Sequence, residues 1–600
     1  MSGIVGIVRS DGQPIDPSLL EEMTDLMQHQ APDAREIWSD GRVGFGHALL
    51  RTTWESENEQ QPLSLDGNIW ITGDIRLDRR QELLDRLLGA GETVEDRHIP
   101  DVNLVWHSYR AWGEACLDYL SGDFAFAIWD SQQQHLFCAR DQFGIVPFYY
   151  AQLGQILVFS NHLNTVRFHP AVSDRLNESA IADFLLFGMK MDRTTTTFAD
   201  IQQLPPAHVL TYSEGRISVR CYWQLPEEVE YLQYQRPEDY VEQFRELFER
   251  SVSDRLRTHR AGTHLSGGMD STSIAATAYK QMRATGASVD FRSYAIVYNH
   301  LIPDEEGDYA KEVAEMADFP IEYLVAEDYL QQAPGKHPEY IYPEPLLIPE
   351  QAAEVEIMRR VAGYSRVLLA GFGGDPLLYP APSSQDKLPQ NPNNLWGYLR
   401  SLRARVRLRT RLRHWLQPEP EEQPNIELPN WLNPDFVERA NLKARQQEIL
   451  SVTPQKDRYG MATAPLWSNI FAWSDPGFTG FPVKVRFPFF DLRLVLYLLS
   501  VPPVPWFEDK FLLREAMEGV LPQSVCQRPK TTLQGFPHYN LMQQRGLQPW
   551  MVELMAVPEL RNYVNGDLLL QRLQFLEKLT PASYTQGGIV LQLSYWLRHR

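Results

Sequence analysis

A glycine-rich turn combines the residue types that bind phosphate groups. It reads Leu265-Ser266-Gly267-Gly268-Met269-Asp270-Ser271-Thr272 and lies between a short predicted strand and a predicted helix. Paired glycines let backbone N–H groups approach phosphate oxygens, and the N-terminus of the following helix favours an anion. The hydroxyls of Ser266, Ser271 and Thr272 can donate further hydrogen bonds, whereas Asp270 repels phosphate unless a divalent cation such as Mg²⁺ lies between them. The turn lacks the lysine of G-x-x-x-x-G-K-[ST], so it is not a Walker A loop.

Two further segments could complete a nucleotide site. The turn Ala370-Gly371-Phe372-Gly373-Gly374-Asp375 follows a predicted strand at Val367–Leu369, and parallel sheets bind their ligands at the carboxyl ends of strands. Asp375 would then be the second Mg²⁺ carboxylate, facing Asp270. Lys530, in Arg528-Pro529-Lys530-Thr531, is a fixed cation that could hold a leaving pyrophosphate and stabilise charge in the transition state.

The elements that must position these residues predict two domains. After Pro237 a long helix begins, and strands near 262, at 291–298, at 321–325 and at 367–369 alternate with helices. This alternation predicts an α/β domain with a doubly wound parallel sheet. Residues 1–225 read instead as many short strands with a few helices, which predicts an α+β unit. The expected domains are therefore 1–225 and 236–600, joined by a polar segment at 224–238.

Composition narrows the class of protein. The chain has 600 residues, more than the roughly 250–300 at which a single hydrophobic core stops growing, so at least two domains are expected. Subtracting 77 acidic from 57 basic residues gives a charge of −20, which argues against a nucleic-acid partner. The four cysteines form no C-x-x-C pair, as suits a reducing compartment. Since no apolar window reaches about 18 residues, no membrane-spanning segment is expected, and the sequence predicts a cytoplasmic enzyme.

One local charge cluster departs from the acidic balance. The stretch Arg400–Arg413 holds seven arginines in fourteen residues. It is either a solvated helix flanking the acidic loop at 418–424 or a patch that docks an acidic peptide or partner.

Several strings together resemble the asparagine synthetase family over nearly the entire chain. They are Met1-Ser2-Gly3-Ile4-Val5-Gly6-Ile7, the run from Ser121 to Asp130, the run from Ala139 to Ile145, and the phosphate turn itself. The resemblance implies an N-terminal glutaminase-like sandwich of the Ntn-hydrolase fold. It also implies a PP-loop ATP pyrophosphatase domain, which activates a carboxylate as an adenylate and releases pyrophosphate.

The resemblance also supplies candidate site residues. The ATP-binding candidates are Leu265, Ser266, Gly267, Gly268, Asp270, Ser271, Thr272, Ile296 beside the adenine, Ala370, Gly371 and Gly373. The candidate catalytic residues are Lys530, Asp270 and Asp375, and the two aspartates are the candidate metal ligands.

The first domain departs from the family at its glutamine site. The family hydrolyses glutamine with a cysteine at position 2, where this chain has Ser2. The family's R-G-P-D appears as Gln30-Ala31-Pro32-Asp33, its H-x-R-L as His47-Ala48-Leu49-Leu50, and its N-G-E as Thr72-Gly73-Asp74. The arginine that would clamp the glutamine carboxylate and the asparagine of the oxyanion site are both replaced. We therefore expect a retained scaffold that does not make ammonia, although an N-terminal serine remains a possible nucleophile.

The second domain departs where the acceptor would be activated. The family string S-G-E-G-A-D-E carries a glutamate at the position of Phe372, and Pro376 replaces its last glutamate. Phe372 cannot act as a base, and its ring indicates a larger, less polar acceptor than ammonia. As an ATP-binding member without a working glutamine site, the chain is similar to the lasso peptide cyclases, and the segments Thr72–Asp78 and Pro429–Arg439 also resemble that subgroup.

Three functions remain open from the sequence. The first is a lasso peptide cyclase that uses ATP and Mg²⁺ to join an Asp or Glu side chain of a precursor peptide to its own α-amine. The resemblance to the lasso peptide cyclases also implies a leader-recognition protein and a maturation protease as further partners. The second is an ammonia-dependent asparagine synthetase or another amide ligase. The third is a non-catalytic ATP-binding partner protein.

Overall fold

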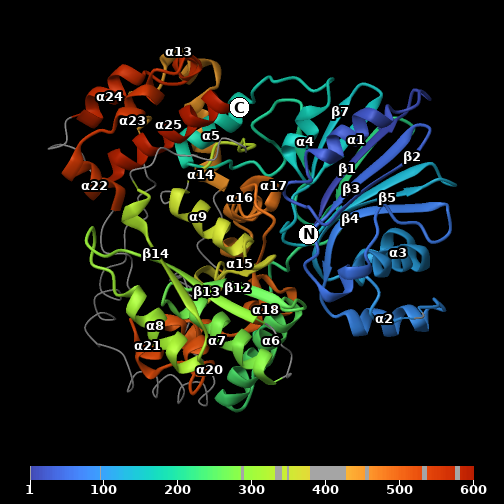
Figure 1. Ribbon diagram of the computed structural model, residues 1–600, viewed down its shortest axis with the longest axis horizontal. Helices are drawn as coiled ribbons and strands as arrows, with labels where there is room; N and C mark the ends of the chain where they lie inside the picture. The colour runs from blue at the N-terminus through green and yellow to red at the C-terminus, as the bar shows by residue number, and fades with distance from the viewer. Residues whose placement is uncertain are drawn as a thin grey trace.

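The computed structural model contains an antiparallel sandwich and a parallel-sheet domain that lie against each other (Figure 1). The predicted α+β plus α/β fold is confirmed. The structure describes residues 2–94, 96–284, 290–330, 341–347, 351–378, 427–452, 458–529, 537–574 and 581–600. Within these residues no helix is both long enough and apolar enough to cross a bilayer.

Two antiparallel sheets form the first domain. One has the order β2 (Ala34–Asp40), β3 (Val43–Leu49), β1 (Gly3–Arg9), β8 (Ile156–Ser160), β7 (Tyr149–Leu153), β9 (Gln202–Gln203). The other has the order β11 (Arg216–Cys221), β10 (His208–Ser213), β6 (His135–Arg140), β5 (Gly122–Asp130), β4 (Ile69–Leu77). Ile4 and Phe45 from the first sheet pack with Ala127 and Leu210 from the second, so the core lies between the sheets.

Helices cover the outer faces of this sandwich. The helices α1 (Pro17–Asp25), α3 (Asp101–Trp112) and α4 (Leu163–Phe168) contact the sheets. The helix α2 (Arg80–Gly89) packs on α3, and α5 (Glu178–Phe187) packs on a C-terminal helix. The Asp16 side chain accepts a hydrogen bond from the backbone N–H of Ser18 at 2.9 Å, and Pro17 occupies the first turn, so these two residues define the start of α1. Because helices and the second sheet cover both faces of β1, this strand reads as a continuous apolar run.

The second domain is built on five parallel strands. Their order is β14 (Ile321–Val325), β13 (Asp290–Val297), β12 (Arg260–His264), β15 (Val367–Leu369), β16 (Lys484–Arg486). The helices around this sheet are α6 (Pro237–Asp254), α7 (Met269–Ala284), α8 (Glu306–Ala317), α9 (Gln351–Ala362), α10 (Gly374–Leu378), α15 (Arg458–Ala462), α16 (Leu466–Trp473), α18 (Leu492–Ser500), α19 (Pro503–Trp506), α20 (Phe511–Ala516) and α21 (Gln523–Gln527). The carboxyl ends of β12 and β15 are neighbours, which brings the two glycine-rich turns to the same edge.

A C-terminal group of helices packs back on the first domain. It consists of α13 (Pro434–Arg439), α14 (Leu442–Val452), α22 (Pro537–Arg545), α23 (Pro549–Met555), α24 (Gly566–Gln574) and α25 (Pro581–His599). In Figure 1 these orange and red helices lie beside α5, and α25 contacts α5 directly. Ile181 and Phe184 of α5 share one apolar cluster with Val590 and Leu593 of α25, so the core is continuous across the domains.

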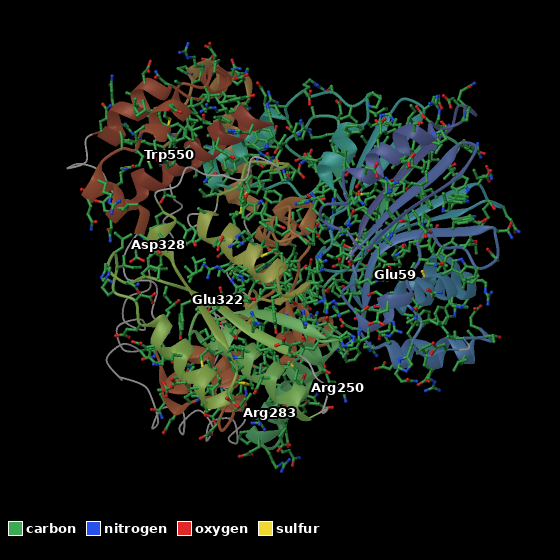
Figure 2. The ribbon with its side chains drawn as sticks, in the orientation of Figure 1. Glu59, Arg250, Arg283, Glu322, Asp328 and Trp550 are labelled. Atoms are coloured by element: carbon green, nitrogen blue, oxygen red, sulfur yellow. The ribbon has the colours of Figure 1, made fainter. Side chains whose placement is uncertain are left out.

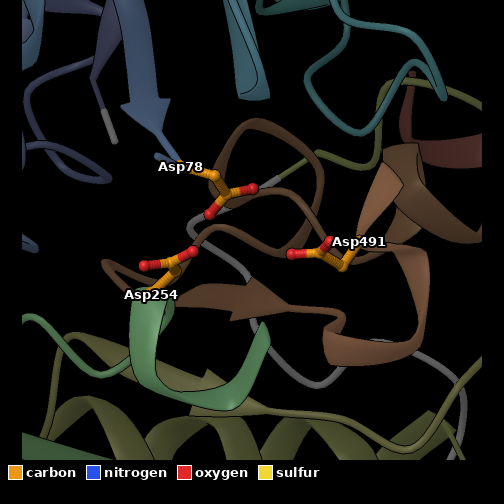
Figure 3. Close-up of side chains that lie close together, drawn as sticks. All are labelled: Asp78, Asp254 and Asp491. Atoms are coloured by element: carbon orange, nitrogen blue, oxygen red, sulfur yellow. The ribbon is translucent and has the colours of Figure 1, made fainter. Parts of the chain in front are cut away.

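A network of arginines and aspartates also joins the domains. It comprises Arg76, Asp78 and Asp123 from the first domain and Asp254, Arg255, Asp491 and Arg493 from the second. Figure 3 shows Asp78, Asp254 and Asp491 pointing toward one another. One carboxylate oxygen from each of them lies within 4.8 Å of the other two. Burial acts to raise the pKa of Asp78, but the charges of Arg76 and Arg255 outweigh it and hold that pKa below its usual range. Arginines therefore supply the positive charge that these neighbouring carboxylates require.

Candidate active site

The phosphate turn is built by a left-handed glycine and by its own hydroxyls. Gly267 has φ +68°, and a Cβ atom there would collide with the carbonyl oxygen of Glu306 in α8, so only glycine fits. The backbone N–H of Ser266 donates to Ser271 Oγ at 3.1 Å, which closes the turn on the start of α7. Ser266 and Ser271 both line a cavity in front of the turn, and their contacts with phosphate stay a prediction.

Thr272 contributes differently from its predicted role. Its Oγ1 donates to the carbonyl oxygen of Gly268 at 2.8 Å, and the side chain is buried. The hydroxyl therefore fastens the turn to the first turn of α7 and does not face the cavity.

The second glycine-rich turn lies directly against the first. A Cβ atom at Gly374 would collide with the carboxylate of Asp270, and one at Gly371 would lie 3.1 Å from the backbone nitrogen of Ser271. The backbone N–H of Ala370 donates to the carbonyl oxygen of Arg486 in β16 at 3.0 Å, which anchors this turn on the sheet. The absence of a side chain at Gly374 therefore lets Asp375 approach Asp270 from the neighbouring turn.

Lys510 lies between these two aspartates. Its Nζ donates to Asp270 Oδ1 and Oδ2 at 2.7 and 2.6 Å, and it lies 2.6 Å from Asp375 Oδ1. Lys510 is not among the residues that the sequence predicts for this site. It directly precedes the helix α20, which begins at Phe511, and its backbone has φ +56°. A cation at a helix N-terminus opposes the helix dipole, and that unfavourable placement was the one signal that could have singled it out.

These residues surround a charged cavity of about 180 Å³. Its lining residues are Ser266, Gly268, Met269, Asp270, Ser271, Glu306, Asp375, Asp509, Lys510, Arg514, Val525, Arg528 and Pro529. Arg528 Nη1 donates to the carbonyl oxygen of Gly267 at 3.1 Å, and its guanidinium carbon lies 4.3 Å from the ring centroid of Tyr309. Burial, together with the charge of Asp304, raises the pKa of Glu306 to about 7, so this carboxyl group can hold or accept a proton near neutral pH.

Other predicted residues lie beside this cavity or outside the described chain. The backbone N–H of Leu265 donates to the carbonyl oxygen of Tyr294 at 2.9 Å, and Ile296 lies in β13 on the same sheet. Gly373 has φ +97° and packs against Phe490, so it shapes the second turn. Lys530 and the stretch Arg400–Arg413 lie outside the described residues, so their roles stay predictions.

The aspartate pair fits a divalent cation. The Lys510 ammonium acts as a stand-in ion, since one cation already lies within 2.7 Å of three oxygens from the two carboxylates. Carboxylate oxygens are the ligands that Mg²⁺ takes beside substrate phosphates. Asp270 and Asp375 would therefore hold Mg²⁺, and the metal would neutralise charge on the phosphates of a bound nucleotide.

The Ser2 site in the first domain is closed. The backbone N–H of Ser2 donates to Asp74 Oδ1 at 3.0 Å, and Asn161 Nδ2 donates to the carbonyl oxygen of Ser2 at 2.7 Å. Asp475 and Pro476 come from the second domain, at the start of the short helix α17 (Pro476–Thr479), and line the same narrow space as Ser2 and Asp74. Ser2 is only 5% exposed, so little room remains around it.

Comparisons with known proteins agree with this arrangement. Residues 243–598 match the family described as asparagine synthase, which is more than half of the chain. The chain belongs to the asparagine synthetase family. Residues 1–223 match a glutamine amidotransferase domain, so both halves of the asparagine synthetase architecture are present. Members of this family are ATP-dependent amide ligases, and the chain belongs to this class of enzyme.

Two of the similar curated proteins cover nearly the whole chain, and a third covers about half of it. Asparagine synthetase [glutamine-hydrolyzing] 3 of Bacillus subtilis is 26% identical over 604 residues, covering 92% of this chain and 89% of that protein. Asparagine synthetase [glutamine-hydrolyzing] 1 of the same organism is 24% identical, covering 96% and 93%. Amidase chry2 of Gibberella zeae is 29% identical over 308 residues, covering 46% of this chain and 42% of that protein.

Proposed function

We propose that this asparagine synthetase-like ligase is a macrolactam synthetase of the lasso peptide cyclase type. It would adenylate an Asp or Glu side chain of a precursor peptide, and the peptide's N-terminal amine would then attack. The observation that carries the proposal is Phe372, which stands where the family string has a glutamate and is 49% exposed beside the phosphate turn.

The surroundings of Phe372 support an apolar acceptor. Its ring centroid lies 6.2 Å from that of Phe487, which packs on Phe471 at 4.9 Å. An exposed aromatic ring next to a buried aromatic cluster offers apolar surface to a ligand. A peptide chain would cover that surface, whereas ammonia would leave it in water.

The closed Ser2 site supports an acceptor other than glutamine-derived ammonia. Lys484 Nζ pairs with Asp475 Oδ2 at 2.9 Å, and both side chains are buried where the domains meet. Admitting glutamine would require this ion pair and Pro476 to move, which would expose or unpair two buried charges.

The proposed chemistry balances in two steps. A carboxylate oxygen of the peptide attacks the α-phosphorus of ATP, and the bond to the β-phosphate oxygen breaks, so pyrophosphate leaves and an acyl adenylate forms. The peptide amine then attacks the acyl carbon, loses a proton and expels AMP. The Ser266–Ser271 turn and Arg528 would bind and orient the phosphates, and Phe372 would hold the folded peptide so that proximity supplies much of the rate.

A direct assay tests this function. The full-length protein is incubated with ATP, Mg²⁺ and a leaderless precursor peptide, with the leader-recognition protein and maturation protease added in a parallel reaction. We expect a peptide that has lost one water, with one AMP released per ring closed. AMP release without a peptide-dependent change in mass would overturn the proposal.

The names of the relatives favour a second candidate, an asparagine synthetase. The Bacillus subtilis proteins that carry that name cover about nine-tenths of this chain. Formation of asparagine from aspartate, ATP and ammonium, with no peptide product, would establish it. Adding glutamine in place of ammonium separates an ammonia-dependent enzyme from a glutamine-hydrolysing one.

Replacing Ser2 tests whether the first domain takes part in the chemistry. Ser2→Ala should leave AMP formation within about twofold of the wild type, because the hydroxyl is enclosed by a closed site. Neither protein should release glutamate from glutamine above the rate without enzyme. Glutamate release by the wild type that is lost in Ser2→Ala would show an active glutaminase instead.

Replacing Phe372 tests the apolar acceptor. Phe372→Glu should lower kcat/KM for the peptide by about 10–100-fold, because a charge would be desolvated against apolar peptide groups. Phe372→Leu, which keeps an apolar side chain, should stay within about threefold of the wild type. Equal losses in both variants would assign Phe372 a packing role, and a gain of asparagine synthesis in Phe372→Glu would favour the second candidate.

A further inference from the structure

The backbone that carries Lys510 is held in an uncommon conformation. Asp509 and Lys510 are consecutive non-glycine residues with φ of +51° and +56°. Such residues lie in a sparsely populated region and persist only where surrounding contacts hold them. Arg514 supplies those contacts: its Nε donates to the Asp509 carbonyl oxygen at 2.6 Å, and its Nη1 donates to the Cys526 carbonyl oxygen at 2.7 Å.

This conformation directs the lysine toward the two aspartates of the phosphate site. Lys510 is only 6% exposed, and its Nζ contacts both Asp270 and Asp375. The ammonium therefore takes the position between the two carboxylates that a shared divalent cation requires. Mg²⁺ binds carboxylate oxygens at about 2.0–2.1 Å, so a metal and the ammonium could not share these oxygens without strong repulsion.

We propose that Lys510 occupies the metal position in the nucleotide-free protein and yields it only when nucleotide phosphates arrive with the metal. This inference rests on the part of the proposed function that concerns ATP and Mg²⁺, not on the identity of the acceptor. Displaced from the aspartates, the ammonium remains beside the cavity that Ser266 and Arg528 line, where phosphate oxygens would attract it. Metal and nucleotide then bind together, because either one alone leaves a charge unpaired.

The consequence is a measurable coupling between two ligands. In the nucleotide-free protein the metal must displace the ammonium of Lys510 from the two aspartates. The apparent affinity for the metal is then the intrinsic affinity multiplied by the fraction of molecules in which that ion pair is broken. Removing the ammonium should restore metal binding without nucleotide. The coupling between metal and nucleotide is reciprocal, and in this proposal Lys510 is its source. Removing the ammonium should therefore also reduce the degree to which a nucleotide tightens metal binding.

The test is Mn²⁺ binding to the full-length protein, measured from the electron paramagnetic resonance signal of free Mn²⁺. Lys510→Met should bind Mn²⁺ without nucleotide at least about 10-fold more tightly than the wild type. Lys510→Arg, which keeps a cation, should bind as weakly as the wild type. Lys280→Met is the matched control, since Lys280 is an exposed lysine paired with Glu249 at 2.9 Å outside the cavity, and it should change nothing.

Further arms separate this inference from the proposed function. Asp375→Asn combined with Lys510→Met should abolish the gained site, which assigns it to the aspartate pair. A non-hydrolysable ATP analogue should tighten Mn²⁺ binding in the wild type and much less in Lys510→Met. No gain in Lys510→Met or Lys510→Gln, with thermal unfolding unchanged, would overturn the inference. Failure of the peptide assay alone would overturn only the macrolactam function.

Discussion

Asp375→Asn should lower AMP formation more than about 100-fold, because even groups that only support a metal ligand typically contribute 10–100-fold. Asp375 is one of the two carboxylates that share the Lys510 ammonium, and Gly374 lets it approach Asp270. An amide keeps the size of the side chain but removes its charge. The variant should therefore fold normally and lose affinity for the nucleotide–metal complex.

Two measurements check this expectation. AMP formation is followed with whichever acceptor supports turnover, and binding of a non-hydrolysable ATP analogue with Mg²⁺ is followed by calorimetry. Glu315→Gln is the control. Glu315 is an exposed carboxylate on α8, and its ion pair with the exposed Lys311 is long, at 3.7 Å. A loss of less than about threefold in Asp375→Asn would remove Asp375 from the metal site.

Arg255→Met should reduce the free energy of unfolding by about 3–5 kcal/mol, the usual cost of removing one partner from a buried ion pair. Arg255 Nη1 lies 3.2 Å from Asp491 and 3.8 Å from Asp78, and it donates to the Ser251 carbonyl oxygen at 3.1 Å. Asp78, Asp254 and Asp491 face one another across the domain boundary (Figure 3). Without Arg255, too little positive charge remains to balance these carboxylates.

Urea unfolding followed by fluorescence measures this effect, and it should also separate the unfolding of the two domains. Arg250→Ala is the control, because Arg250 is an exposed residue of α6 (Figure 2) that pairs only with Glu246 among its described contacts, at 2.6 Å. That variant should lie within about 0.5 kcal/mol of the wild type. If the two variants had equal stability, the network would not hold the domains together.

Much of the nucleotide site could be predicted from the sequence because its signals are local. The glycine pair, the hydroxyls and Asp270 lie within eight consecutive residues, and the turn ending at Asp375 directly follows its strand. Strand and helix alternation then places both turns at one edge of a parallel sheet. The start of α1 is local in the same way, because the Asp16 side chain caps it and Pro17 occupies its first turn.

The tertiary structure decided what lies between those turns and what covers Ser2. Lys510 reaches Asp270 across 240 residues, and it has a left-handed backbone next to Asp509, whose carbonyl oxygen accepts a hydrogen bond from Arg514. Likewise, Asp475 and Pro476 close the Ser2 site only because the C-terminal half of the chain folds back on the first domain. The sequence determined which groups can bind phosphate and metal, since that follows from residue type and short spacing. The position of each opposing charge and closing segment depended on long-range packing, which no local pattern encodes.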